Sequence, residues 1–191
     1  IAAGTYKQST GFSVPMGVNL VGGFAGGETS KSDRKRSDIS GNGFIEGWEF
    51  TNQTILDGDV GTLGVSTDNC RVLQILSSAS QDVVTTLDGL VVQNGLSNTR
   101  GGGIVSERTN QIEYSSAPLI MNCLFRNNSA KNGGAICVAS MNGSNHAMVV
   151  SNSCFYSNSA TETGGAIYAE QNTNLSIESC SFFNNSSANG G

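Results

Sequence analysis

The chain has 191 residues, of which 37% are hydrophobic and only 13% are charged, so it can bury a core and does not have the composition of a disordered chain. A net charge of -5 argues against binding to nucleic acid, which requires Lys and Arg gathered on one face. No apolar run is long enough for a membrane-spanning helix, and no stretch of these residues has the charged-then-apolar pattern of a signal segment. The start at Ile1 and the end at Gly191 favour a segment, residues 1–191, of a longer protein.

The first thirty-six residues alternate short β-prone pieces with glycine-rich turns. The stretch "GGFAGG" lacks the Lys of a phosphate-binding loop, so we interpret it as turn chemistry. In "TSKSDRKRS", Ser30 and Asp33 have the spacing of a capping box, which predicts the start of a short helix. We expect the basic residues of this stretch to neutralise the acidic loop that follows; they are Lys31, Arg34, Lys35 and Arg36.

An acidic loop at residues 38–49 matches the spacing of a calcium-binding loop. Oxygen-bearing residues alternate around Gly43, which takes the position of the sharp turn. The predicted ligands are Asp38, Ser40, Asn42, the Phe44 carbonyl, Glu46 and Glu49. Oxygen ligands in a flexible shell favour Ca²⁺ over zinc and magnesium. The loop is similar to the single loop of EF-hands and dockerins, and it predicts a calcium site within an insertion at residues 28–53.

The alternative is an ordinary Asn-Gly turn, because only three of the predicted ligands are acids. The preceding stretch has no apolar stripe, so a paired sensor with a hydrophobic groove is not expected. Trp48 and Phe50 can anchor the insertion to the body of the protein. We therefore expect calcium, if bound, to stiffen the insertion and not to switch or catalyse.

Three similar segments recur in the second half of the chain. They are "CLFRNNSAKNGGAI" from Cys123, "CFYSNSATETGGAI" from Cys154 and "CSFFNNSSANGG" from Cys180. Each places a Phe three residues before an Asn and ends in a Gly pair. A weaker copy, "VVQNGLSNTRGGGI", puts Val91 in the Phe position and Asn94 in the Asn position. The clearest repeats therefore span residues 87–191.

A period near 30 residues, with β-prone pieces and no helical pattern, predicts an all-β fold, the right-handed parallel β-helix. Each coil would return the same position to the same place, one strand spacing further along. We expect the repeat Phe side chains to stack inside, the repeat Asn side chains to form a ladder at a turn, and the Gly pair to turn the chain with positive φ. A β-sandwich or barrel would explain short strands but not the matched offsets.

These FxxN and GGA(I/L/V) signatures resemble the repeats of the polymorphic outer-membrane proteins of chlamydiae and of related β-helix surface proteins of Bacteroidetes and other Gram-negative bacteria. The pieces "IAAGTY", "GVNLVGGFAGGETS" and "QTILDGDVG" resemble the opening coils of such proteins. The resemblance implies a pectin-lyase-like solenoid and a secreted or cell-surface (outer-membrane) location. It does not imply one activity, because this fold carries lyases, hydrolases, adhesins and passive stalks.

The five cysteines do not predict a disulfide framework. Cys123 and Cys180 occupy the same repeat position two coils apart, beyond the reach of a disulfide, and Ser153 takes that position in between. We expect buried thiols, with a Cys123–Cys154 pair left open. With one histidine and no CxxC spacing, no zinc site is expected.

The predicted function is structural or adhesive: a polar rod that presents loops such as 105–117 and 140–147 to a host or surface glycan, a protein ligand or other parts of a cell-surface assembly. The alternative is part of a polysaccharide lyase or glycoside hydrolase whose catalytic residues lie largely outside this segment. Candidate acids for it are Asp57, Asp59, Asp68, Asp82 and Asp88, and the basic candidates are Arg100, Arg108, Arg126, Lys131 and His146. The basic residues fall in different repeat positions, so no catalytic residue is assigned.

Overall fold

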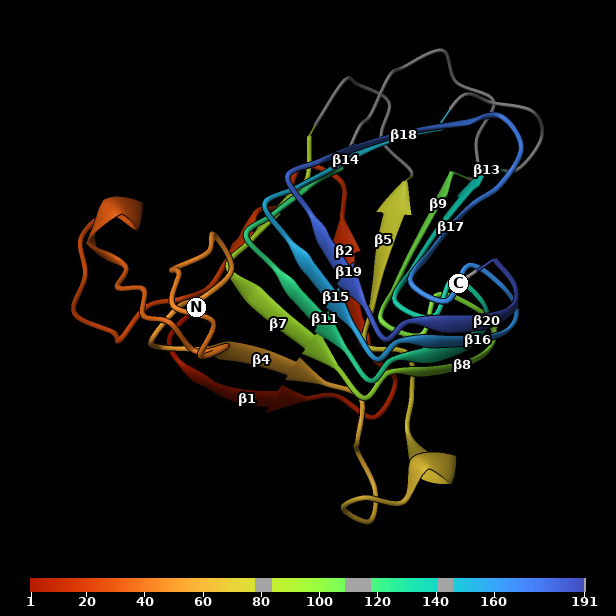
Figure 1. Cartoon of the computed structure of the whole chain (residues 1–191), viewed down its shortest axis with the longest axis horizontal. Coiled ribbons are helices and arrows are strands. Elements are labelled where there is room, and N and C mark those ends of the chain that lie inside the picture. The colour runs from red at the N-terminus through yellow and green to blue at the C-terminus, as the bar shows by residue number, and fades with distance from the viewer. Residues whose placement is uncertain (78–83, 109–117, 141–145, 191) are drawn as a thin grey trace.

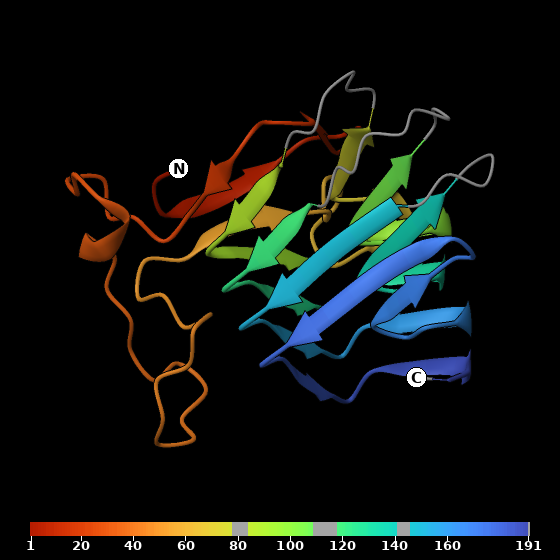
Figure 2. The same ribbon diagram turned by 90° about the horizontal axis from the view of Figure 1, so that it is seen from above.

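The computed structural model describes residues 1–77, 84–108, 118–140 and 146–190. Within them the strands form four parallel sheets, each built from one strand of successive coils. The chain turns counter-clockwise in Figure 1 while later coils lie nearer the viewer, and Figure 2 shows the coils stacked in chain order. The predicted right-handed parallel β-helix is confirmed. Most of the two predicted display loops, 105–117 and 140–147, lies outside the described residues.

We number the sheets in the order in which a coil passes through them. Sheet 1 holds β1 (Gly4–Lys7), β4 (Thr54–Asp57), β7 (Leu90–Gln93), β11 (Leu124–Arg126), β15 (Cys154–Tyr156) and β19 (Ser181–Phe183). Sheet 2 holds β8 (Leu96–Arg100), β12 (Ser129–Asn132), β16 (Ser159–Thr163) and β20 (Ser186–Asn189). Sheet 3 holds β2 (Phe12–Pro15), β5 (Leu73–Ser77), β9 (Ile104–Arg108), β13 (Ile136–Ser140) and β17 (Ile167–Ala169). Sheet 4 holds β3 (Leu20–Val21), β6 (Thr86–Asp88), β10 (Leu119–Met121), β14 (His146–Ser151) and β18 (Thr173–Glu178).

Two connections depart from this pattern. The 28–53 insertion lies between β3 and β4 and contains the short 3₁₀ helix η1 (Lys31–Asp33), which begins with the predicted capping box of Ser30 and Asp33. The 58–70 loop follows β4 and contains the 3₁₀ helix η2 (Ser66–Asp68). It occupies the part of its coil where later coils have a sheet 2 strand. Both connections project from the body of the β-helix (Figure 1).

The corners that lead into and out of sheet 1 are made by residues with left-handed backbone, and asparagine fills most of these positions. The corner from sheet 4 to sheet 1 has φ of 73, 54, 47 and 52° at Gly89, Asn122, Asn152 and Ser179. The corner from sheet 1 to sheet 2 has φ of 55, 56, 52 and 55° at Asn94, Asn127, Ser157 and Asn184. Asn tolerates this conformation better than most residues because its short side chain can bond to the local backbone.

The repeat phenylalanines stack in the core as predicted. The ring centroids of Phe125 and Phe155 are 4.8 Å apart, and those of Phe155 and Phe182 are 4.7 Å apart, with nearly parallel planes. Phe125 and Phe155 are fully buried. Full burial of such a side chain stabilises the fold by roughly 1.5–3 kcal/mol, so the column is a main source of stability in these coils.

The repeat asparagines form a continuous ladder beside this column, in which Asn128 and Asn158 are fully buried and Asn185 is half-buried. Asn158 Oδ1 accepts hydrogen bonds from the backbone N–H and the side-chain Nδ2 of Asn128, at 3.1 and 2.9 Å. Asn185 Oδ1 accepts the same two bonds from Asn158, at 3.0 and 2.9 Å. Each Nδ2 also donates to a backbone carbonyl, as Asn158 does to Phe125. Because every coil satisfies the polar groups of the next, the ladder fixes the register of the stack.

The predicted register of the weaker repeat is wrong by one residue. Phe125 pairs with Val92, not Val91, and Val92 is the residue that faces the core. Gly95 takes the ladder position, because its N–H donates to Asn128 Oδ1 at 2.9 Å. Asn94 instead occupies the left-handed corner. A shift of one residue exchanges the two faces of a strand, so Val91 points outward.

The Gly pairs turn the chain from sheet 2 into sheet 3 as predicted. Gly133 and Gly164 have φ of 66 and 64°, which favours glycine. The second glycine is needed for space: a Cβ on Gly134 would lie 2.2 Å from the carbonyl oxygen of Gly165 in the next coil. Consecutive coils therefore approach too closely here for any side chain.

The five cysteines are free thiols. Cys123 and Ser153 share one repeat position, as predicted, because the Cys123 N–H donates to Ser153 Oγ at 3.1 Å. Burial raises the pKa of Cys123 to about 12, so it stays a protonated thiol. Cys154 lies on the outer face of sheet 1, whereas Cys123 packs in the core, and the pair left open by the sequence therefore does not form. None of the described helices is long or apolar enough to cross a bilayer.

Candidate functional site

The 28–53 insertion is anchored to the outer face of sheet 1, as predicted from its aromatic residues. Trp48 packs against an outward-facing apolar cluster that contains Val91, Leu124 and Cys154. Gly47 fits against the corner asparagines, since a Cβ there would lie 3.0 Å from Asn122 Oδ1. The insertion thus covers apolar surface that the outward side of a solenoid strand would otherwise expose.

A buried ion pair forms the second anchor, and the sequence did not predict it. Arg34 donates to both carboxylate oxygens of Asp88 at 3.0–3.3 Å, and both side chains are almost fully buried. The Arg34 guanidinium also lies over the ring of Phe50, 4.5 Å from its centroid. Asp88 further accepts a bond from Asn122 Nδ2 at 2.8 Å. The insertion is therefore locked to the end of β6.

The expected neutralisation of the acidic loop by the basic cluster is wrong. Lys31, like Arg34, lies near Asp88 of the β-helix body, at 3.6 Å. Arg36 donates to the Gly47 carbonyl at 3.0 Å. Among the described residues, none of the ion pairs involves Asp38, Glu46 or Glu49. Nothing in the sequence indicates that Arg34 would reach a partner 54 residues away.

The carboxylate of Asp38 organises the first half of the predicted calcium loop. Its Oδ1 accepts the N–H groups of Gly41 and Asn42 and the Ser40 hydroxyl, and its Oδ2 accepts the N–H of Gly43 at 2.8 Å. These bonds, the Gly43 amide first, lower the pKa of Asp38 below its ordinary value. Asn42 Oδ1 in turn accepts the Phe44 N–H at 2.9 Å.

Glu49 closes the second half of the loop from a fully buried position. Its Oε1 accepts the N–H groups of Ile39 and Ser40 at 2.9 and 2.7 Å, and its Oε2 accepts the Glu46 N–H at 2.8 Å. Burial alone would raise the pKa of Glu49, but the amides of Glu46, Ser40 and Ile39 outweigh it and lower the pKa. The carboxylate therefore stays ionised inside the loop.

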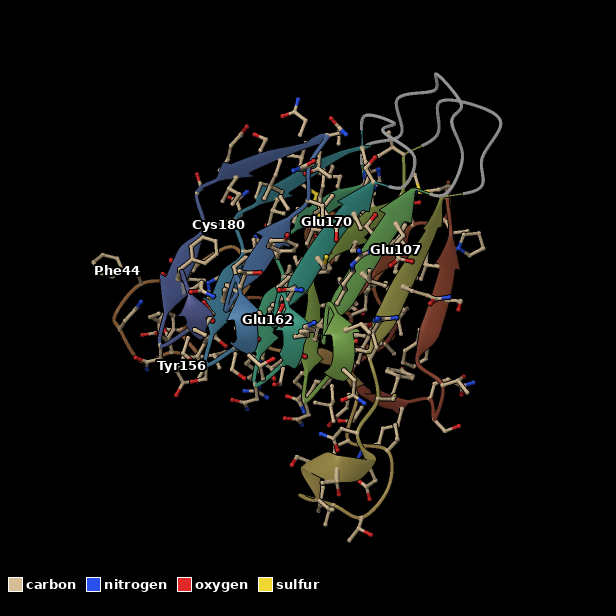
Figure 3. The ribbon with its side chains drawn as sticks, turned by 90° about the vertical axis from the view of Figure 1, so that its right-hand side faces the viewer. Phe44, Glu107, Tyr156, Glu162, Glu170 and Cys180 are labelled. Carbon is tan, nitrogen blue, oxygen red and sulfur yellow. The ribbon has the colours of Figure 1, made fainter. Side chains whose placement is uncertain are left out.

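The residues of all six predicted ligands belong to this one hydrogen-bond network, Phe44 and Glu46 only through their backbone N–H groups. The oxygen chemistry of the ligands suits Ca²⁺. The hydrogen bonds to the loop carboxylates, however, leave less room for tight binding of an ion. A bidentate Glu49 needs both oxygens, yet Oε1 already accepts two amides, which fills its two lone pairs. Within the described residues, no three His, Cys, Asp or Glu side chains gather as a metal-binding group. The Phe44 side chain is 74% exposed and projects away from the body (Figure 3).

An open hollow of about 630 Å³ lies beside the insertion, and its charged lining residues are Glu28, Asp33 and Lys35. Glu28 accepts the N–H groups of Ala25, Gly26 and Gly27 at 2.6–3.0 Å, which lowers its pKa to about 2, the Ala25 amide having the largest effect. A general acid requires a raised pKa. The carboxylates of this hollow therefore serve as turn and helix caps.

The candidate acids of the β-helix body are also tied to structural partners. Asp57 ends β4 and accepts the side-chain amides of Gln93 and Asn94 at 2.8 and 3.0 Å. Asp59 and Asp68 lie in the 58–70 loop, Asp88 is paired with Arg34, and Asp82 lies outside the described residues. Of the described acids, Asp57 and Asp88 are therefore held by other side chains, and Asp59 and Asp68 share the 58–70 loop.

Two segments of the chain, residues 122–139 and 152–170, match the family model of the Chlamydia polymorphic membrane protein repeat. Each begins at a corner Asn before sheet 1 and ends in sheet 3, so it contains the stacked Phe, the ladder Asn and the Gly pair. No curated protein and no solved structure matches the chain. The matched coils thus carry a repeat that is known from bacterial membrane proteins.

Proposed function

We propose that this chain is a structural or adhesive segment of a secreted or cell-surface β-helix protein of a Gram-negative bacterium. The observation that carries the proposal is the unbroken stacking of Phe125 on Phe155 and of Asn128 on Asn158 in the two coils that match the chlamydial repeat. Such columns make a stiff rod, which suits a protein that holds a surface away from the cell. The kinship with Bacteroidetes surface proteins remains a prediction from the sequence.

The outer surface supports a display role. Several of its charged side chains form pairs: Arg100 lies 2.8 Å from Glu170 and 3.8 Å from Glu107, and Lys131 lies 3.1 Å from Glu162. Figure 3 shows these glutamates spread over the outer faces of the coils. A surface of this kind suits contact with a glycan, a protein ligand or other parts of a surface assembly, and its acidity does not suit nucleic acid.

The enzymatic alternative, part of a polysaccharide lyase or glycoside hydrolase, has weaker support. A lyase requires a basic residue that can reach its substrate. His146 is fully buried and bonds to Ser106, and Arg126 bonds to Gln93. Arg100 and Lys131 are held in the ion pairs described above.

Incubation of the chain with polyuronates and with a panel of surface glycans tests the proposal. We expect no release of unsaturated or reducing ends at high protein concentration, together with retention on a subset of immobilised glycans or proteins. Turnover that persists in repurified protein would contradict the structural role and favour the enzyme.

We also propose that the 38–49 loop binds Ca²⁺ weakly, as a stiffening ion. The inward-facing, ionised carboxylates of Asp38 and Glu49 support it, because hard oxygen anions are the ligands that Ca²⁺ prefers. An ion must displace some of the amides that these oxygens accept, so we expect millimolar affinity. Titration with Ca²⁺ should change the fluorescence of Trp48, and Glu49→Gln should weaken the response. If millimolar Ca²⁺ produced no response, the loop would be a polar turn and not a calcium site.

A further inference from the structure

The 58–70 loop contains buried oxygen atoms without hydrogen-bond partners. Oδ1 of Asp59, Oδ1 of Asp68 and Oδ1 of Asn69 are each buried, and no described residue donates to them. Asp59 as a whole is only 5% exposed. Buried oxygen atoms in proteins are normally hydrogen-bonded, so three exceptions within residues 59–69 point to a group that completes them.

The backbone brings Asp59 and Asn69 together at the base of the loop. The Cys70 N–H donates to the Gly58 carbonyl at 3.0 Å, so the residues just inside this closure, Asp59 and Asn69, flank it from either side. Asn69 Nδ2 donates to the Asn94 carbonyl of the next coil at 2.9 Å. This bond uses the amide nitrogen, while the buried Oδ1 has no donor among the described residues.

Both carboxylates reach across the loop to the turn at residues 61–64. Asp68 Oδ2 accepts the Thr62 N–H at 2.6 Å, and Asp59 Oδ2 accepts the Gly64 N–H at 3.1 Å. One oxygen of each carboxylate is therefore held in place, and the other is unpartnered. Gly61 leaves the room for this arrangement, since a Cβ there would lie 2.2 Å from Asp68 Oδ2.

Within the described part of the chain, no Lys or Arg forms an ion pair with either of these two carboxylates. Residues 58–70 themselves contain no Lys or Arg. Arg71, which follows the loop, directs its guanidinium to the carbonyls of Arg100 and Gly101. Buried charges in proteins are paired or coordinate metal ions.

We propose that the 58–70 loop binds a divalent cation, Ca²⁺, through Asp59 Oδ1, Asp68 Oδ1 and Asn69 Oδ1. Three oxygens, two of them from carboxylates, are the ligands of a hard cation, and Ca²⁺ completes its 6–8 ligands with backbone carbonyls and water. The irregular loop suits Ca²⁺ better than Mg²⁺, which demands octahedral geometry. The ion ties down the one coil in which the loop stands in for a sheet 2 strand.

Calorimetric titration with CaCl₂ after EDTA treatment tests the site. The test variant is the double substitution Asp59→Asn and Asp68→Asn, which keeps the size of both side chains and an oxygen to accept the Gly64 and Thr62 amides. The matched control is Glu49→Gln in the other loop. We expect submillimolar binding by the unaltered chain, a loss of about tenfold or more in affinity in the double variant because affinity follows ligand charge, and retained binding in Glu49→Gln.

Thermal unfolding separates ligation from a purely structural role. Ca²⁺ should raise the unfolding midpoint of the unaltered chain but not that of the double variant. In EDTA the two midpoints should agree, or that of the variant should be higher because the substitutions remove uncompensated charge. Three outcomes would overturn the proposal: binding that persists in the double variant, binding lost in Glu49→Gln, or no binding at millimolar Ca²⁺. In the last case the three oxygens bind water instead.

Discussion

The two acidic loops of this β-helix satisfy their carboxylates in opposite ways. In the 38–49 loop, all four carboxylate oxygens of Asp38 and Glu49 accept N–H groups of the loop itself. In the 58–70 loop, Asp59 and Asp68 each bond through one oxygen and bury the other without a partner. The first loop satisfies both carboxylates with its own backbone, whereas the second leaves one oxygen of each carboxylate without a donor among the described residues.

Two properties of a cation site are therefore independent: the spacing of its ligands in the sequence, and whether their oxygens are free of hydrogen-bond donors. The 38–49 loop has the twelve-residue spacing of a calcium loop, but backbone amides occupy its best oxygens. The 58–70 loop matches no such template, yet it holds free acceptors. Because these acceptor oxygens have no donor in the described part of the chain, the 58–70 loop is the better candidate for a cation site.

The largest expected effect concerns how the 28–53 insertion is held. Arg34→Met leaves Asp88 buried without its main partner and should reduce the free energy of unfolding by about 3–5 kcal/mol, since breaking a buried ion pair strands a charge. The loss should be the same with and without Ca²⁺. Urea unfolding measures it.

Lys31→Met is the matched control for this ion pair. Lys31 contacts the same carboxylate from an exposed position, with 57% of its side chain accessible, so its loss should be about 0–1 kcal/mol. Equal losses for the two variants would show that the insertion does not depend on the buried pair.

The next effect is the loss of the Glu49 carboxylate. Glu49→Gln replaces an ionised acceptor of three amides by a neutral one and should lower the free energy of unfolding by about 1.5–3 kcal/mol, the range for hydrogen bonds to charged groups. The loss should already be present in EDTA. Glu46→Gln, whose backbone N–H makes the bond, is the control and should be nearly neutral. A loss seen only with Ca²⁺ would make the ion, not the amides, the organiser of this loop.

The pH dependence of stability follows from the same carboxylate. The folded-state pKa of Glu49 lies below its ordinary value of 4.5, so its contribution is fully present above about pH 4.5 and is lost as the pH falls through the lowered pKa. Unfolding midpoints between pH 6 and pH 3 should therefore fall more steeply for the unaltered chain than for Glu49→Gln. Parallel curves would contradict the role assigned to Glu49.

The smallest effect on stability, and a specific effect on cation binding, is expected for Gly61→Ala. The new methyl group would displace the Asp68 carboxylate without removing a ligand. In EDTA the unfolding midpoint should change little, while the stabilisation by Ca²⁺ should decrease. Thr67→Ala, in the exposed η2 turn, is the control and should keep the full response to Ca²⁺. An unchanged response in Gly61→Ala would remove Asp68 from the ligand set.

The sequence predicted the features that repeat. Stacked coils return Phe125 and Asn128 to equivalent places, so one pattern recurring at matched offsets indicated the fold, the aromatic column and the ladder. The predicted register was wrong at Val92, where no aromatic residue marks the repeat. A single residue of slip could not be detected there, because both valines are apolar.

The anchors and the free acceptors could not be predicted from the sequence. The Arg34–Asp88 pair joins an insertion to a strand that begins 52 residues later, and no local pattern links them. The sequence offers Asp59 and Asp68 only as candidate acids of the enzymatic alternative, because whether an oxygen has a donor depends on how the loop folds. Which polar atoms find a hydrogen-bond or ionic partner in the folded chain could therefore be seen only in the structure.

The most direct test of the ranking of the two loops is anomalous diffraction from crystals grown with Ca²⁺ or soaked with Tb³⁺ as its substitute. We expect the strongest peak about 2.3–2.6 Å from Asp59 Oδ1, Asp68 Oδ1 and Asn69 Oδ1. A stronger peak beside Glu49 and Asp38, or ordered water alone on the three oxygens of the 58–70 loop, would contradict it.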